Sequence, residues 1–204
     1  MNRSTPSARP MRLGALDERA SLRAATAFAG VILLGFGLLY ALLGAGLGRV
    51  LFPHQATGSL IVVDGQVRGS ELVAQPFVGE GYFRPRPSAA GYDPMAVSGS
   101  NLARSNPDLR ARIDGAVAEV AAREGIPAGK VPGEMVTRSG GGLDPHVSPA
   151  TARVQAARVA RARGLPPVRV EALIAAHTEA PTLGVIGQPR VNVVRLNLAL
   201  DALR

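Results

Sequence analysis

Apolar residues dominate one long stretch near the N-terminus of this chain. From residue 24 to residue 48 the sequence, AATAFAGVILLGFGLLYALLGAGLG, contains no charged side chain. A helix of about 20 apolar residues crosses the hydrocarbon core of a bilayer, whereas the apolar part of a cleaved signal peptide has only about 7–15 residues. The pattern therefore predicts a retained transmembrane helix over 24–48.

Charged residues on the two sides of this stretch predict its orientation. Arginines outnumber acids before it. The arginines are Arg3, Arg9, Arg12, Arg19 and Arg23, and the acids are Asp17 and Glu18. Because basic residues favour the cytoplasmic side, we expect a cytoplasmic tail over 1–23 and an extracytoplasmic domain over 49–204. The chain is thus expected to be a single-pass protein of the cell (inner) membrane.

The first pattern in the expected external domain is that of a β-hairpin over 58–73. The run Leu60–Val63 is rich in β-branched residues, and the pair Asp64-Gly65 is a strong signal for a two-residue turn. The sequence therefore predicts two antiparallel strands at this point.

A second β pattern lies at the C-terminal end, in VIGQPRVNVVRLNLALDAL. Apolar and polar residues alternate there, so that apolar side chains would share one face of a strand. These apolar residues are Val194, Leu196, Leu198 and Leu200. We predict that this C-terminal strand joins the early hairpin and that a short turn follows it.

Three segments between the two β patterns show helical spacing. The first begins at Asn106, a good N-cap residue, and ends near Gly125. The second begins after Ser148 and runs to about residue 163, and the third spans about 167–178. The predicted fold class is therefore α+β: a single N-terminal transmembrane helix followed by one compact extracytoplasmic α+β domain.

Composition excludes several classes of site. The formal net charge is +8, from 23 Lys+Arg against 15 Asp+Glu, which suits nucleic acid or an anionic membrane as a partner. Aromatic residues are only 4% of the chain and Trp is absent, so a base-stacking platform is not expected, and we predict no nucleic-acid partner. The absence of Cys excludes disulfides, thiolate metal sites and a Cys nucleophile.

The glycine-rich stretch TRSGGGLDPHVSP, residues 137–149, is the most distinctive candidate for chemistry. A P-loop needs Lys followed by Ser or Thr after its glycines, whereas Leu143 and Asp144 stand there. We favour a structural turn with a possible partner contact. Glycines allow positive φ, Asp144 precedes a proline, and Ser148 can cap the next helix.

Two other kinds of chemistry stay open for this stretch. Asp144 and His146, with His177 or Glu179, could hold a metal ion, although spacing alone is weak evidence. A Ser-His-Asp triad is a further alternative, although the chain has no G-x-S-x-G motif.

The arginines of the following helix are expected to form a solvated face or a docking face for an acidic partner. They are Arg153, Arg158, Arg161 and Arg163.

The segment over 76–99 is rich in Pro, Gly and Ser and is expected to be a long loop. It carries Tyr82, Phe83 and Tyr92, in a chain with few aromatic residues. A long loop that aromatic side chains order is often functional, but such side chains can also simply cover the core. Both interpretations stay open.

Four motifs, in order along the chain, resemble those of a known family. They are GYFRPRPSA (81–89), SGSNLARSNPDL (98–109), VTRSGGGLDPHVSPATARVQAARVARARGL (136–165) and IGQPRVNVVRLNLALDAL (186–203), preceded by the apolar stretch. Over about residues 24–204 the chain is similar to the KdpC subunits of bacterial potassium-transporting P-type ATPases. Departures such as Pro85, where the family usually has Gly, affect loop geometry rather than membership.

This resemblance implies a non-catalytic subunit of a high-affinity, ATP-driven potassium uptake complex. The implied partners, beside the lipid bilayer, are a channel-like potassium-selecting subunit, a P-type ATP-hydrolysing subunit and a small single-span subunit. Such subunits are described as catalytic chaperones that raise the ATP affinity of the pump subunit, which links the family to ATP-binding. We expect no cofactor, metal or catalytic residue in this chain, because ATP and potassium are handled by the complex. Since an external domain cannot touch cytoplasmic ATP, we favour a stabiliser of the assembly.

The shared motifs also suggest residues that order loops or contact other subunits. They are Tyr82, Arg86, Ser88, Asn101, Asp144, Gln155 and Asn192. Gln155 lies in the middle of the second predicted helix and is either a hydrogen-bonding residue of the core or an interface contact. The alternative to the subunit is a membrane-anchored extracytoplasmic ligand-binding or metal-dependent hydrolase domain.

Overall fold

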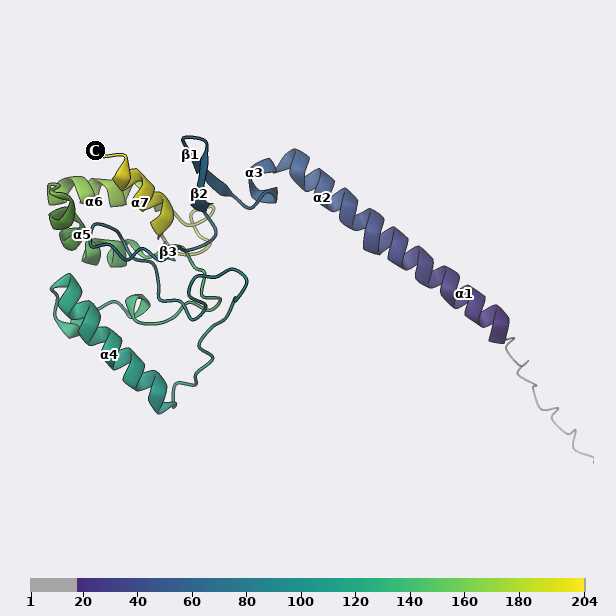
Figure 1. Cartoon of the computed structure of the whole chain (residues 1–204), viewed down its shortest axis with the longest axis horizontal. Coiled ribbons are helices and arrows are strands. Elements are labelled where there is room, and N and C mark those ends of the chain that lie inside the picture. The colour runs from purple at the N-terminus through teal and green to yellow at the C-terminus, as the bar shows by residue number, and fades with distance from the viewer. Residues whose placement is uncertain (1–17, 204) are drawn as a thin grey trace, which may run out of the picture. The chain divides into compact units, whose positions relative to one another are not determined.

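Internal contacts divide the chain into two units, Met1–Ala56 and Thr57–Arg204 (Figure 1). The computed structural model describes residues 18–203. Most of the tail expected over 1–23 lies outside these residues. The boundary between the units falls just after the predicted transmembrane helix.

The first unit is one long helix followed by a short one. α1 (Glu18–Val31), the π-helical segment η1 (Ile32–Leu39) and α2 (Tyr40–Leu51) continue one another, and α3 (Pro53–Ala56) follows. Within the described residues, Ser21–Leu51 is the one helix that is long and apolar enough to cross a membrane. The helix therefore contains the predicted span and extends beyond it at both ends.

The second unit begins with the predicted β-hairpin. β1 (Leu60–Val63) and β2 (Gln66–Ser70) are antiparallel, and Val63 pairs with Gln66 across the turn. Asp64 has φ 52° and Gly65 has φ 73°, the positive angles that the tightest hairpin turns require. The hairpin forms a two-stranded sheet of its own.

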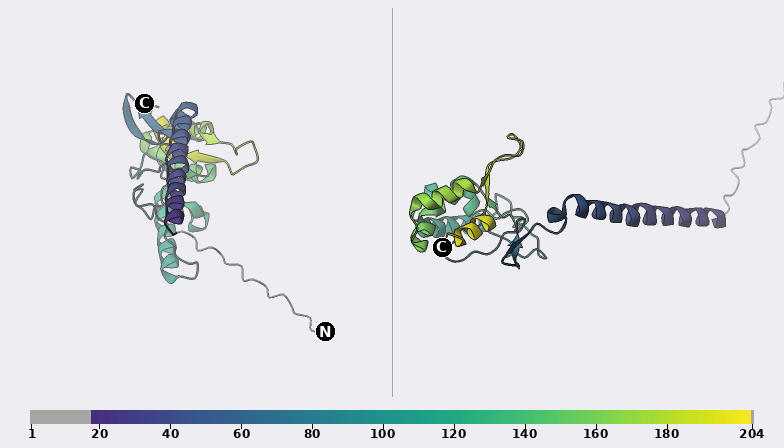
Figure 2. Two further views of the ribbon diagram at one scale, coloured as in Figure 1. Left: turned by 90° about the vertical axis from the view of Figure 1, so that its right-hand side faces the viewer. Right: turned by 90° about the horizontal axis from the view of Figure 1, so that it is seen from above.

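A separate three-stranded sheet lies in the order β3-β5-β4. Its strands are β3 (His146–Val147), β4 (Thr178–Glu179) and β5 (Arg190–Asn192). Both outer strands run antiparallel to β5. The connection from β4 to β5 projects from the rest of the second unit as an arm (Figure 2).

The C-terminal apolar segment is a helix, α7 (Val193–Asp201), and the prediction of a strand there is wrong. That strand was to contain Val194, Leu196, Leu198 and Leu200. Instead only β5 is extended, and it pairs with β3 and β4 rather than with the hairpin. The residues that the helix buries have helical spacing: they are Val193, Val194, Leu196, Asn197 and Leu200. Asn192 starts this helix, since its side chain accepts hydrogen bonds from the first backbone N–H groups.

The three predicted helices are present. They are α4 (Pro107–Glu124), α5 (Pro149–Arg163) and α6 (Pro167–Ala176). Asn106 caps α4 and Ser148 caps α5, and each side chain accepts a hydrogen bond from a backbone N–H of its helix. Both helices end at a glycine with positive φ. α6 ends before the predicted residue 178, because Thr178 has already entered β4.

Two clusters of apolar side chains form the core of the second unit. The main cluster packs α5, α6, α7 and β5 together. It contains Phe83, Val147, Ala152, Ala156, Val159, Ala160, Val170, Ile174, Val191, Val193, Leu196 and Leu200. The second cluster joins α4 to the short 3-10 turns η2 (Ala128–Lys130) and η3 (Gly133–Met135), and is built on Val120, Met135 and Val136. These features confirm the predicted α+β class.

Candidate functional site

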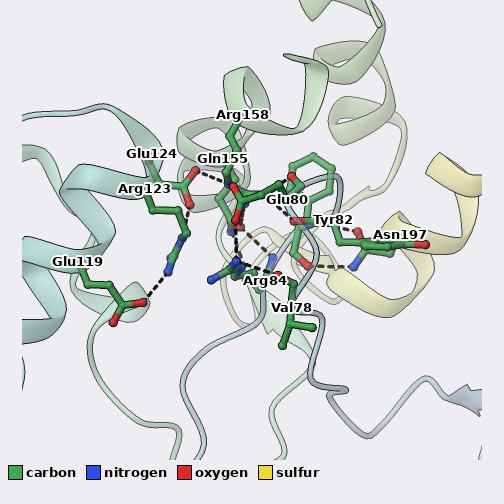
Figure 3. Close-up of polar contacts among 11 residues, drawn as sticks. Val78, Glu80, Tyr82, Arg84, Glu119, Arg123, Glu124, Gln155, Arg158 and Asn197 are labelled. Carbon is green, nitrogen blue, oxygen red and sulfur yellow. Dashed lines mark hydrogen bonds and ion pairs between the residues drawn. The ribbon is translucent and has the colours of Figure 1, made fainter. Parts of the chain in front are cut away.

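Two amide side chains hold consecutive residues of the long loop by their backbones. Gln155 on α5 accepts a hydrogen bond from the N–H of Arg84 (2.8 Å) and donates one to its carbonyl oxygen (3.1 Å). Asn197 on α7 does the same for Phe83, at 2.9 Å for both bonds. Both amides are fully buried, and Figure 3 draws both side chains with their hydrogen bonds to the loop. They replace the strand partner that this part of the loop, residues 80–84 and here called the clamped segment, lacks.

Arg158 supports the clamped segment from the same face of α5. Its guanidinium donates to the carbonyl oxygens of Glu80 and Tyr82, and to Oε1 of Gln155 at 3.0 Å. It also forms a buried ion pair with Glu124 on α4, with Nε 3.0 Å from Oε2. The other oxygen of Glu124 accepts from Arg123 at 2.9 Å. Arg158 thereby links α4, α5 and the loop (Figure 3).

A third contact fixes the other side of the clamped segment. Arg163 donates to the carbonyl oxygen of Gly81 (2.8 Å) and to Asp201 on α7 (2.7 Å). Its guanidinium lies 4.5 Å from the centre of the Tyr82 ring, a cation–π contact. The hydroxyl of Tyr82 donates to Asp201 (3.3 Å). A Cβ on Gly81 would lie 2.9 Å from Nε of Arg163, so a larger residue there would displace this guanidinium.

The glycine-rich stretch packs against the next part of the loop. The hydroxyl of Ser88 donates to the carbonyl oxygen of Gly142 (2.6 Å), and the N–H of Ser139 donates to Pro87 (3.1 Å). The same hydroxyl accepts from the N–H of Tyr92, whose own hydroxyl donates to the carbonyl oxygen of Arg86 (3.1 Å). The stretch therefore forms the predicted structural turn, and its backbone is bound to residues of the long loop.

Asp144 fixes the end of this turn. Its carboxylate accepts from the N–H of His146 (3.0 Å) and lies 3.5 Å from a guanidinium nitrogen of Arg86. Burial alone would raise the pKa of Asp144, but the hydrogen bonds from His146 and the charges of His146 and Arg86 outweigh it and lower the pKa. Burial raises the pKa of the nearby Tyr92 hydroxyl.

The remaining two expected residues lie apart from the clamped segment. Asn192 is buried, caps α7 and donates its amide to the carbonyl oxygen of Glu71 (2.7 Å), which ties the chain after the hairpin to α7. Asn101 is exposed and adopts a positive φ of 50°. The structure thus groups Tyr82 with Gln155, and Arg86 with Ser88 and Asp144. Whether any of them contacts another subunit stays a prediction.

Sequence reasoning missed several residues of this site. Arg158 was expected on a solvated or docking face, but it is only 4% exposed, whereas Arg153 and Arg161 are exposed. Its helical spacing was the available signal, because positions 151, 155 and 158 share one face of α5 and all three are buried. No local pattern marked Glu124 or Asn197, since their partners are distant in sequence.

The polar groups around the clamped segment mostly bind backbone atoms, which is an arrangement that positions a loop. Across the described residues 18–203, no group of three or more His, Asp or Glu side chains could hold a metal ion. Asp144 and His146 do contact each other, with Nδ1 of His146 3.5 Å from Oδ1. The metal-dependent hydrolase alternative therefore has no ligand set in that part of the chain.

Comparison with known proteins matches almost the whole chain to one family. The family model described as KdpC: K+-transporting ATPase, c chain, matches residues 22–202. A Potassium-transporting ATPase KdpC subunit from Xanthomonas axonopodis pv. citri is 60% identical over 187 residues, which cover 91% of each chain. The subunit of the same name from Shewanella putrefaciens is 52% identical over 165 residues, which cover 81% of this chain and 83% of the relative. The chain therefore belongs to the KdpC family of K+-transporting ATPase subunits.

Proposed function

We propose that this chain is a non-catalytic subunit of a potassium-transporting ATPase and that it stabilises the assembled complex. The observation that carries the proposal is the extent of the family match. Residues 22–202 include both the candidate membrane helix and the second unit, and the relatives are named as subunits of such an ATPase.

The arrangement of the buried polar side chains supports a non-catalytic role. Gln155, Asn197 and Arg158 are hydrogen-bonded to the backbone of the clamped segment. Side chains that fix backbone atoms in the core shape a rigid surface, and rigid surfaces suit binding of a partner subunit. The partners that we propose are a channel-like potassium-selecting subunit, a P-type ATP-hydrolysing subunit and a small single-span subunit.

We place the N-terminus in the cytoplasm and the second unit outside, in the inner membrane. The support is the excess of arginine before the span, at Arg3, Arg9, Arg12, Arg19 and Arg23. In this orientation the second unit does not meet cytoplasmic ATP. An effect on the ATP affinity of the pump subunit, as a catalytic chaperone would have, must then pass through the membrane part of the complex.

The proposed role is tested by assembly. The other subunits are expressed with and without this chain, and the complex is isolated through a tag on the ATP-hydrolysing subunit. We expect the tagged subunit to retain the channel-like subunit when this chain is present and to lose most of it in detergent when the chain is absent. Equal retention in both preparations would reject the stabilising role.

Orientation is tested by single-cysteine labelling, because the chain has no cysteine of its own. Met95 is 92% exposed, so Met95→Cys places a thiol on an accessible surface, whereas Ser139 in the glycine-rich turn is only 3% exposed. We expect a membrane-impermeant reagent to label Met95→Cys in intact cells and to label Ser7→Cys only after lysis. The reverse pattern would place the second unit in the cytoplasm and reopen direct contact with ATP.

A further inference from the structure

A cavity of about 370 Å³ lies between the long loop, α4 and the segment around η3. One face of α4 lines it through Arg112, Ala116, Glu119 and Arg123, residues at helical spacing. The loop contributes prolines and an arginine, among them Pro76, Pro85, Pro87 and Arg84. The cavity is separate from the packed interior where Gln155 and Asn197 hold the clamped segment, but Arg84 belongs to both.

Positive charge dominates this cavity. Its lining contains Arg84, Arg112, Arg123 and Arg138 but only one acid, Glu119. Arg123 is paired with Glu119 at 3.2 Å and Arg84 with Glu80 at 2.9 Å (Figure 3). Among the residues that the structure describes, no ion pair joins Arg112 or Arg138. The cavity therefore contains guanidinium charge that the described chain does not neutralise.

Two of these arginines also have donors without acceptors. The Nε atoms of Arg84 and Arg112 are buried, and neither has a hydrogen-bond partner within residues 18–203. Burial lowers the pKa of Arg84, and the charges of Arg123 and Arg158 lower it further. An anionic group in the cavity would relieve the repulsion among the guanidinium groups.

The walls of the cavity favour one kind of anion. Pro76, Pro85 and Pro87 have no backbone N–H, so the donors come mainly from guanidinium groups. A planar guanidinium matches a group with two oxygens, whereas phosphate sites in proteins typically add several backbone N–H groups. Phe77 and Val120 offer apolar contact to the carbon atoms of a ligand.

We propose that this cavity binds a carboxylate group, carried either by a small organic acid or by an Asp or Glu side chain of a neighbouring protein chain. Arg112 is the central contact, because it has no ion pair within the described residues and its described hydrogen bond, to the carbonyl oxygen of Val136 at 3.2 Å, leaves further guanidinium donors available. Arg84 and Arg138 add charge from the loop and from the glycine-rich side. The small-acid form of the proposal does not depend on the subunit role.

The first experiment uses the full chain in neutral detergent micelles with sodium succinate as the probe. The melting temperature is followed by circular dichroism against sodium chloride of equal ionic strength. A bound carboxylate should raise the melting temperature along a saturating curve. In Arg112→Gln the half-saturating concentration should rise at least about tenfold, because a bidentate charged contact is lost. Arg110→Gln, which removes the same charge from an exposed position of α4, should leave it within about twofold.

The second experiment separates a protein carboxylate from a free one. If succinate gives no saturating response, Arg112→Gln should reduce co-purification with the other ATPase subunits at least about tenfold, while Arg110→Gln retains it. If Arg112→Gln loses the circular dichroism spectrum of a helical protein, both experiments are repeated with Arg138→Gln. A saturating response that Arg112→Gln leaves unchanged overturns the proposal, and so does the absence of both effects. Failure of the unmodified chain to co-purify would instead reject the subunit role, and succinate binding alone would then decide the proposal.

Discussion

The side chain of Gln155 hydrogen-bonds both the N–H and the carbonyl oxygen of Arg84, 71 positions earlier in the chain. Gln155→Leu would leave both backbone groups buried without partners. We expect a loss of about 2–4 kcal/mol in the free energy of unfolding, since each unpaired buried group costs about 1–3 kcal/mol. Thermal unfolding of the full chain in detergent, followed by circular dichroism, measures the loss. Gln188→Leu, at an exposed position, is the matched control, and equal melting temperatures for the two variants would contradict the expectation.

The buried ion pair between Glu124 and Arg158 predicts a non-additive result. Glu124→Leu should cost about 3–5 kcal/mol, because it removes the buried countercharge of Arg158 and leaves only the exposed carboxylate of Glu80, 3.9 Å away. The double variant with Arg158→Met should cost less than the sum of the two single changes. A double-mutant cycle in urea checks this coupling. Glu119→Leu, whose carboxylate is exposed, should cost less than about 1 kcal/mol, and strict additivity in the cycle would argue against the pair.

Two glycines of one turn should respond differently to alanine. Gly142 has φ 74°, and a Cβ there would lie 2.9 Å from Ser88, Ala90 and the carbonyl oxygen of Ser98. We expect Gly142→Ala to destabilise the chain by about 1–3 kcal/mol. At Gly140 a Cβ would meet nothing within 4 Å, so Gly140→Ala should be neutral or slightly stabilising. A melting temperature of Gly142→Ala at or above that of Gly140→Ala would contradict the geometry of the turn.

The lowered pKa of Asp144 predicts a pH dependence of stability. A carboxyl group whose pKa is lower in the folded chain stabilises the fold above its unfolded pKa, about 3.9, and loses this effect as the pH falls through the folded value. Asp144→Asn should therefore lower the melting temperature at pH 6. The corresponding loss in the free energy of unfolding should be less than about 1 kcal/mol, because the carboxylate is partly exposed. The difference from the unmodified chain should shrink below about pH 4. Asp114→Asn, on the exposed side of α4, is the control; a difference that grows toward low pH would show that the sign is wrong.

Local signals predicted the features that depend on neighbours in sequence. Asp64-Gly65 gave the hairpin turn, and Asn106 and Ser148 gave the starts of α4 and α5, because each acts on residues within a few positions. The strand prediction for the C-terminal segment was wrong because the apolar residues there fit both the strand period and the helix period. The helical form buries Asn197, whose hydrogen-bond partner, Phe83, lies 114 positions earlier in the chain. No short-range pattern contains that contact.

The candidate site was only partly accessible for the same reason. Gln155 was singled out with two open roles, and the structure shows it as a hydrogen-bonding residue of the core. Arg158 was grouped with its solvated neighbours, since nothing in an arginine-rich helix states which arginine will meet a carboxylate from another helix. That carboxylate belongs to Glu124, 34 positions earlier. Long-range pairing of this kind depends on how α4 and α5 pack, which follows from the core as a whole.

The backbone and the guanidinium of Arg84 lie in different parts of the second unit. Its backbone is bonded to Gln155 in the interior, while its guanidinium lines the arginine-rich cavity beside α4. A ligand in the proposed site would therefore contact a residue whose backbone is fixed in the interior. We expect such a ligand to slow amide hydrogen exchange at Arg84, because that N–H is bonded to Gln155.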